Sequence, residues 1–230
     1  MVKLSKIIKW YLKTIMTSPV YEIVLLIVVL VQYASLFLSS SYFMFIFDSS
    51  ILSFPVTAVF VGSGIFRDKS IQIFELNLFQ SRRRISISKV IAAFITFIPI
   101  LIINSLILVY FNYSFLIVPS ILSMFVIFGI MSLSAIYNST NQAITTTIMF
   151  SFLLPLSIEA LLNNYASMGM RPNIVIASFS YLFSPLFAFY FFKDGIISLN
   201  PDYGYLFSFV FASFLVCIYI LFTDKFQIKP

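Results

Sequence analysis

Long apolar runs separated by short polar turns dominate the chain. Six runs are long enough to matter, at residues 21–38, 51–66, 90–111, 115–137, 144–163 and 205–223. A helix needs about 20 mostly apolar residues to cross the hydrocarbon core of a bilayer. The pattern therefore predicts an all-α, polytopic membrane helix bundle with six transmembrane helices. We expect the second crossing to begin near Ile51, after the polar Asp48, Ser49 and Ser50.

A seventh apolar run, residues 174–192, gives two possible topologies. Counted as a full crossing, it makes seven spans and leaves the two ends of the chain on opposite sides of the membrane. However, Ser180, Ser184 and Pro185 interrupt it, and irregular backbone at membrane depth is tolerated only where protein buries it. We favour six spans, with residues 174–192 as a re-entrant or outer hairpin before the last span.

The segment 3–18 has the pattern of a helix that lies in the membrane interface. Its polar face carries Lys3, Lys6, Lys9 and Lys13, while apolar residues fill the opposite arc and Trp10 supplies an amphipathic ring. Lysines on one face and apolar residues on the other are typical of amphipathic interfacial helices. Such a helix either also contacts a cytoplasmic partner or serves only as a topology signal beside the first span.

The charge distribution orients the bundle. Residues 67–89 form a basic island between the second and third crossings, and short loops rich in Lys and Arg stay in the cytoplasm. We expect a multi-pass protein of the plasma membrane with both termini cytoplasmic. The net charge of +6 then reflects topology and not nucleic-acid binding, so nucleic acid is not among the expected partners.

Composition excludes several classes of function. The chain is 61% hydrophobic and only 10% charged, so one membrane domain over residues 1–230 leaves no room for a sizeable soluble domain. It contains no histidine and a single cysteine, Cys217, which removes the common metal ligands and nucleophile pairs. No phosphate-binding loop of the type G-x-x-x-x-G-K-[ST] occurs. We expect neither an enzyme nor a chain that binds a cofactor or metal of its own.

The basic island combines charge with apolar side chains. Ile71, Phe74 and Leu78 recur at helical spacing, and three arginines follow at Arg82, Arg83 and Arg84. A helix that inserts into the groove of a soluble protein needs such apolar anchors with polar flanks. Two plainer interpretations remain open, namely a loop helix lying on the membrane and arginines that only hold lipid phosphates.

The segment Ser70 to Lys89, SIQIFELNLFQSRRRISISK, resembles the region after the second span in permease subunits of ABC-2 (type 2) exporters. There, a coupling helix precedes a Ser-Arg pair, and a Lys opens the third span seven residues after that Arg. Ser81, Arg82 and Lys89 match this spacing. The family's Gly-Thr is Ser70-Ile71 here, and its usual Pro is Phe79. Its acidic position is shifted to Glu75 in this sequence.

The resemblance implies a permease subunit that couples ATP hydrolysis to substrate export. ATP and Mg²⁺ would bind two copies of a separate ABC ATP-binding subunit, and a second permease, identical or paralogous, would complete the assembly among the membrane lipids. The residues expected to contact the ATPase are Ile71, Phe74, Glu75, Leu78, Arg82 and Arg83. An alternative from a different class is a substrate-capture subunit or channel-like bundle that acts without an ATPase.

Two polar residues inside the predicted spans are candidates for a transport pathway. A carboxylate at mid-membrane costs about 2.5 to 3.5 kcal/mol on insertion scales, so Glu159 needs either a cavity or a partner such as Arg171. Asn104 interrupts the third span, where an amide more often bonds a neighbouring helix than a substrate. The sequence does not identify the transported substrate.

Overall fold

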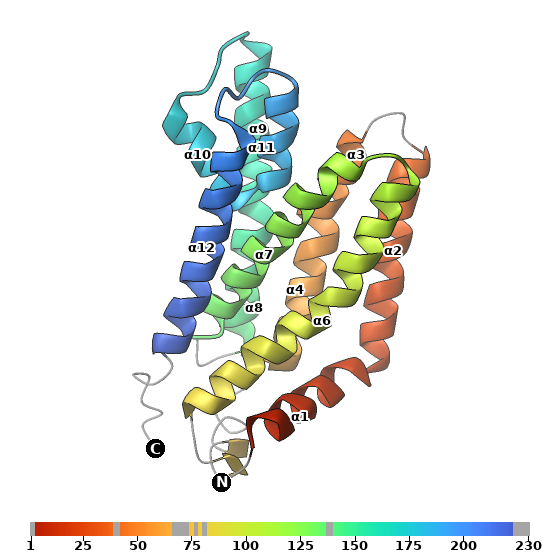
Figure 1. The fold of residues 1–230 in the computed structure, drawn as a ribbon, viewed down its shortest axis with the longest axis vertical. Helices are drawn as coiled ribbons and strands as arrows, with labels where there is room; N and C mark the ends of the chain where they lie inside the picture. Colours follow the sequence, from red (N-terminus) through yellow and green to blue (C-terminus); the bar gives the residue numbers. More distant parts are fainter. Residues whose placement is uncertain are drawn as a thin grey trace.

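The protein is an elongated bundle of helices, seen here in a computed structural model (Figure 1). The structure describes residues 3–38, 42–65, 74–75, 78–79, 82–136 and 140–222, and these residues contain no β-strand. Figure 1 also shows that the first helix lies obliquely across one end of the bundle, where the last helix ends. We call this end, which carries the lysines of the first helix and Arg83 and Arg84, the basic end.

Six helices are long and apolar enough to cross a membrane, and their chain order agrees with the prediction. Three of them consist of an α-helix alone, and three include a short π- or 3₁₀-helical segment. In chain order they are α2 (Pro19–Leu38); α3 (Phe43–Phe47) with η1 (Asp48–Ser53) and α4 (Phe54–Ile65); α6 (Arg82–Tyr110); η2 (Ser114–Leu116) with α7 (Ile117–Ser134); α8 (Thr140–Ile148) with η3 (Met149–Leu153) and α9 (Leu154–Ser167); and α12 (Pro201–Phe222). The chain is therefore a multi-pass membrane protein.

The second of these helices starts earlier than predicted. It begins at Phe43, and the polar residues Asp48, Ser49 and Ser50 lie inside it as part of the π-helical segment η1. The expected start near Ile51 is wrong because these polar side chains face protein instead of ending the helix. Ser49 and Ser50 are almost completely buried.

Each π-helical segment ends two residues before a proline. η1 is followed by Phe54 and Pro55, and η3 is followed by Leu154 and Pro155. A proline has no N–H to donate, and its ring clashes with a carbonyl of the preceding turn. A wider turn relieves that clash without ending the helix, and π-helical turns of this kind recur at functional sites. η1 and η3 contact each other.

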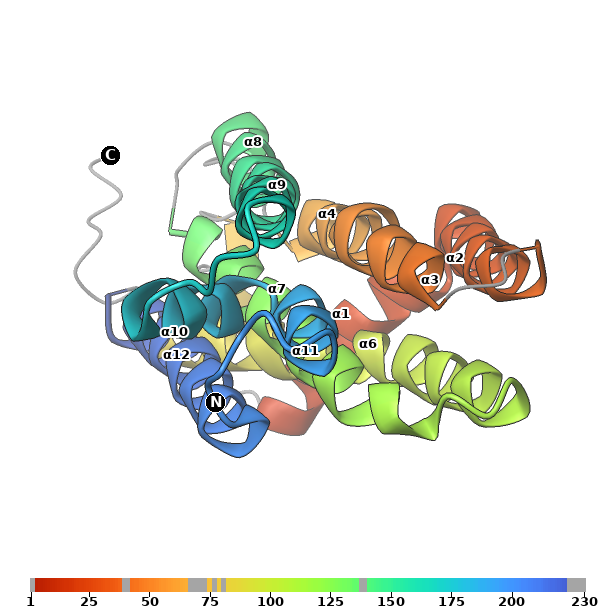
Figure 2. The same cartoon turned by 90° about the horizontal axis from the view of Figure 1, so that it is seen from above.

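Helix α7 occupies the centre of the bundle, as the view from above shows (Figure 2). Its most extensive contact is with α12. Gly129 allows this close approach, because a Cβ atom there would lie 3.0 Å from the backbone oxygen of Ala212. A side chain at position 129 would press against the backbone of α12. The two helices can lie this close together because Gly129 has none.

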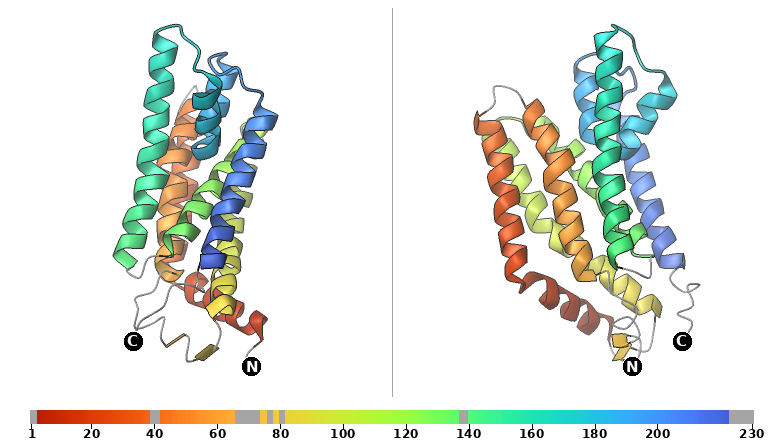
Figure 3. Two further views of the ribbon diagram at one scale, coloured as in Figure 1. Left: turned by 90° about the vertical axis from the view of Figure 1, so that its left-hand side faces the viewer. Right: turned by 180° about the vertical axis from the view of Figure 1, so that it is seen from behind.

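The apolar run before the last span forms two short helices. α10 (Ile174–Phe183) and α11 (Pro185–Lys193) meet at Ser184, and both lie at the end of the bundle opposite the basic end (Figure 3). The Ser208 hydroxyl of α12 donates to the carbonyl of Tyr181 at 2.6 Å. Neither helix is long enough to cross a membrane, so this run does not add a seventh span.

The first helix, α1 (Leu4–Met16), packs against α6. Its buried residues are Ile7, Tyr11 and Ile15, which recur at the spacing of one helical face. The four lysines at positions 3, 6, 9 and 13 are all exposed. One face of α1 is therefore held against the bundle, and its charged face points outward.

Candidate functional site

A buried ion pair lies at the basic end. The Nζ of Lys89, in α6, is 2.8 Å from Oε2 of Glu75, and the two side chains are 8% and 1% exposed. The ammonium also lies 5.5 Å from the centre of the Tyr11 ring of α1. A charge buried in this way is stable only when its partner stays in place, because an isolated buried charge costs several kcal/mol. The pair therefore ties residue 75 to α6.

Aromatic contacts join the same segment to α1. Trp10 packs edge-on against Phe79, with ring centres 5.7 Å apart, and against Tyr11 at 4.9 Å. Apolar side chains of α1 and α6 complete this packing, namely Ile7, Ile85 and Ala92. Tyr219, near the end of α12, forms a hydrogen bond with Ser86 of α6. We call this assembly of Tyr11, Trp10, Glu75, Phe79 and Lys89 the basic-end cluster.

Some of the residues predicted to contact an ATPase are exposed, and one is buried. Phe74 and Leu78 are 60% and 47% exposed, and Arg83 is exposed as well. Glu75 faces the opposite way, into the ion pair with Lys89. Ile71 and the side chain of Arg82 lie outside the described residues. The segment thus presents apolar side chains to its surroundings while its carboxylate holds it to the bundle.

The two predicted pathway residues lie on different helices, and no hydrogen bond joins them. Asn104, on α6, is 1% exposed, and neither its amide nitrogen nor its amide oxygen has a hydrogen-bond partner. Glu159, on α9, is partly exposed and accepts a hydrogen bond from the amide of Asn163 one turn further on. The carboxylate of Glu159 is therefore satisfied by a neighbour on its own helix.

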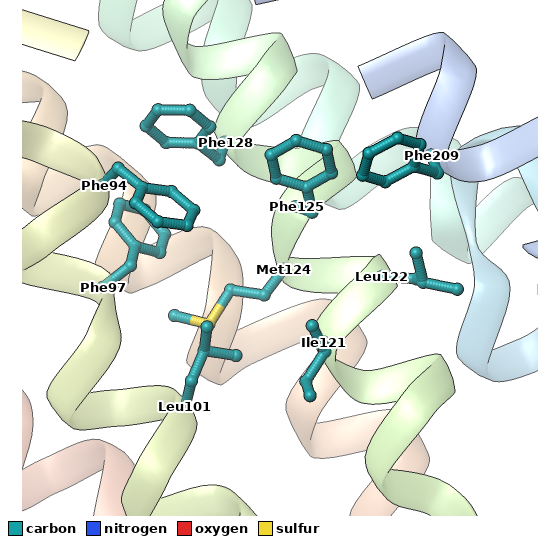
Figure 4. Close-up of a pocket in the computed structure, with 9 residues that line it drawn as sticks. All are labelled: Phe94, Phe97, Leu101, Ile121, Leu122, Met124, Phe125, Phe128 and Phe209. Carbon is teal, nitrogen blue, oxygen red and sulfur yellow. The ribbon is translucent and has the colours of Figure 1, made fainter. Parts of the chain in front are cut away.

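Two of the apolar cavities in the described part of the bundle lie between its spans. One of about 450 Å³ lies between α4 with η1 and α8 with η3, and its lining includes Pro55, Phe60 and Phe152. The other, of about 240 Å³, lies between α6, α7 and α12, and Figure 4 shows the five phenylalanines and Met124 that gather around it. A cavity of about 150 Å³ is enough to hold benzene, so both can accommodate apolar groups.

An aromatic cluster at the opposite end was not foreseen from the sequence. The Lys193 ammonium lies 3.5 Å from the centre of the Phe115 ring and 5.9 Å from that of Tyr42. Burial, with a smaller contribution from Asp194, raises the pKa of Tyr42 above its usual value. These contacts join the residue before α3, the segment η2 before α7, and the last residue of α11. Only the abundance of Tyr and Phe could have suggested them.

The described residues contain no group of three or more His, Cys, Asp or Glu side chains placed to hold a metal ion. Comparison of the chain with protein-family models, with curated proteins and with solved structures finds no match.

Proposed function

We propose that the chain is the membrane-spanning permease subunit of an ATP-driven exporter of the ABC-2 type. The observation that supports this most concerns the described residues 74, 75, 78 and 79 of the basic island. Its apolar side chains Phe74 and Leu78 are exposed, while Glu75 and Phe79 anchor it to α6 and α1. Exposed apolar side chains on an anchored helical segment fit insertion into a groove of a soluble partner. That partner is an ATP-binding subunit, present in two copies.

Force applied to this segment has a direct route into the bundle. The Glu75–Lys89 ion pair leads to α6, and the contact between Trp10 and Phe79 leads to α1, which continues into α2. The hydrogen bond between Ser86 and Tyr219 connects α6 to α12. Closure of the two ATPase subunits then tilts these helices together. The bundle changes state because the partner binds its two arrangements with different affinity.

The proposal also assigns each part of the chain to a side of the membrane. The basic end and both termini face the cytoplasm of a plasma-membrane protein, and α1 lies in the inner interface with its lysines near anionic lipid headgroups. Helices α10 and α11 form a re-entrant hairpin on the outer side. A second permease, identical or paralogous, pairs with this one. The cavity between α4 and α8, beside the two π-helical segments, is the candidate route for an apolar or amphipathic substrate.

Substitution of Phe74 by Asp tests the proposal. We expect Phe74→Asp to leave the protein inserted in the membrane but to remove ATPase co-purification and export, because a charge replaces an apolar anchor. Met168→Asp is the matched control, since Met168 is 59% exposed against 60% for Phe74 but lies in the loop after α9, at the other end. The control should retain the ATPase.

Unchanged co-purification and unchanged export in Phe74→Asp would contradict the coupling role. Equal losses in both variants would also contradict it, because a general effect of the added charge would then explain the result. Insertion is checked in each case by the amount of monodisperse protein extracted from membranes.

A further inference from the structure

The π-helical segment η1 and the facing part of α2 gather oxygen atoms inside the membrane-spanning region. The amide nitrogen of Gln32 donates to the Ser49 hydroxyl at 3.5 Å, and Gln32 is completely buried. The Ser35 hydroxyl donates to the Gln32 carbonyl at 2.9 Å, and Ser35 also forms a hydrogen bond with Asp48. By the rise of about 1.5 Å per residue, Gln32 and Asp48 each lie about 7 to 9 Å inside the outer ends of their helices.

Several oxygens of this group have no hydrogen-bond partner. They are Oε1 of Gln32 and the hydroxyls of Ser50 and Ser53, and the two serines are each 2% exposed. In hydrocarbon, each unsatisfied polar group costs several kcal/mol, so this arrangement requires something that binds oxygen.

The charge of the group points to a cation. Asp48 is partly buried, and among the described residues no Lys or Arg forms an ion pair with it. A carboxylate, an amide oxygen and serine hydroxyls are among the oxygen ligands that hard cations prefer. Irregular segments of membrane helices also form Na⁺ sites in transporters.

We propose that Gln32, Asp48 and Ser49 form a binding site for Na⁺ in the outer half of the bundle. The site is separate from the basic-end cluster and does not depend on an ATPase partner. Na⁺ neutralises the Asp48 carboxylate and joins α2 to η1, so its binding stabilises the contact between the first two spans.

Equilibrium binding of ²²Na⁺ to the purified full chain in nanodiscs tests the site directly. We expect saturable binding of one ion per chain, at least tenfold weaker in Asp48→Asn and in Ser49→Ala. Asp194→Asn is the control, because it removes an exposed carboxylate at the same end of the bundle. It should bind as the wild type does.

Thermal unfolding gives an independent readout. NaCl should raise the Tm by about 5 to 10 °C at a hundredfold excess over Kd, relative to N-methyl-D-glucamine chloride at equal ionic strength. The proposal is overturned if no saturable binding is found, if Asp48→Asn and Ser49→Ala both bind normally, or if the two salts have equal effects. Equal effects of the two salts would mean that water alone fills the site. Because Ser49→Ala is a mild change, the test stands even where Asp48→Asn does not fold.

Discussion

The Glu75–Lys89 ion pair makes a quantitative prediction about stability. Glu75→Gln leaves the Lys89 ammonium buried without its carboxylate, and Lys89→Met leaves the Glu75 carboxylate in the same position. Removal of one partner from a buried pair costs about 3 to 5 kcal/mol. We expect the lower end of this range, because Lys89 keeps 8% exposure and its contact with the Tyr11 ring. For a chain of this size, about 3 kcal/mol corresponds to a fall in Tm of about 6 to 12 °C.

The double variant separates pairing from burial. Glu75→Gln with Lys89→Met contains no buried charge, and replacement of a whole buried pair by neutral side chains is often close to neutral. We therefore expect its Tm to lie closer to that of the wild type than to that of either single variant. Trp10 is the only tryptophan and contacts Phe79, so its fluorescence during heating reports on this cluster.

Exposed charges at the same end provide the controls. Lys13→Met and Glu22→Gln alter side chains that are exposed, and each should change the Tm by no more than about 2 °C. Single Glu75 and Lys89 variants that behave like these controls would refute the account. So would a double variant whose loss equals the sum of the two single losses, because independent effects would then replace the pair.

Two further predictions concern the hairpin and the first helix. Gly204→Ala should lower the Tm by about 2 to 12 °C, because its Cβ would lie 2.4 Å from the Tyr181 ring and overpacking costs about 1 to 3 kcal/mol. The double variant with Tyr181→Ala should lose less than the sum of the two single losses, and an unchanged Tm in Gly204→Ala would contradict this packing. Trp10 fluorescence in bilayers should be quenched more by lipids brominated near the headgroup than by lipids brominated near the chain ends, as expected for an interfacial α1; the reverse order would place α1 deeper.

The sequence predicts the helices well because their signal is long and local. Each apolar run of about 20 residues identifies a span regardless of its neighbours. The sequence places the start of the second span too late, because Asp48, Ser49 and Ser50 resemble a polar turn. The hydroxyl of Ser49 accepts a hydrogen bond from Gln32, which lies on another helix. A polar residue read in isolation does not reveal the partner that makes its burial possible.

The candidate site was predictable only in part. The spacing of Phe74 and Leu78 indicates an apolar helical face, and both side chains are exposed. The inward orientation of Glu75 was not foreseen, because its partner Lys89 is fourteen residues away and no periodicity connects the two. The contact between Trp10 and Phe79 likewise joins segments that are distant in the sequence.

Site-specific photocross-linking from residue 74 in native membranes tests the central claim most directly. A photoreactive amino acid at position 74 should form a cross-link to a soluble ATP-binding protein, and the same group at position 168 should not. Cross-links from position 74 only to lipid or to this chain, with no ATP-binding protein captured, would contradict the proposal that the exposed segment is the contact for a separate ATPase.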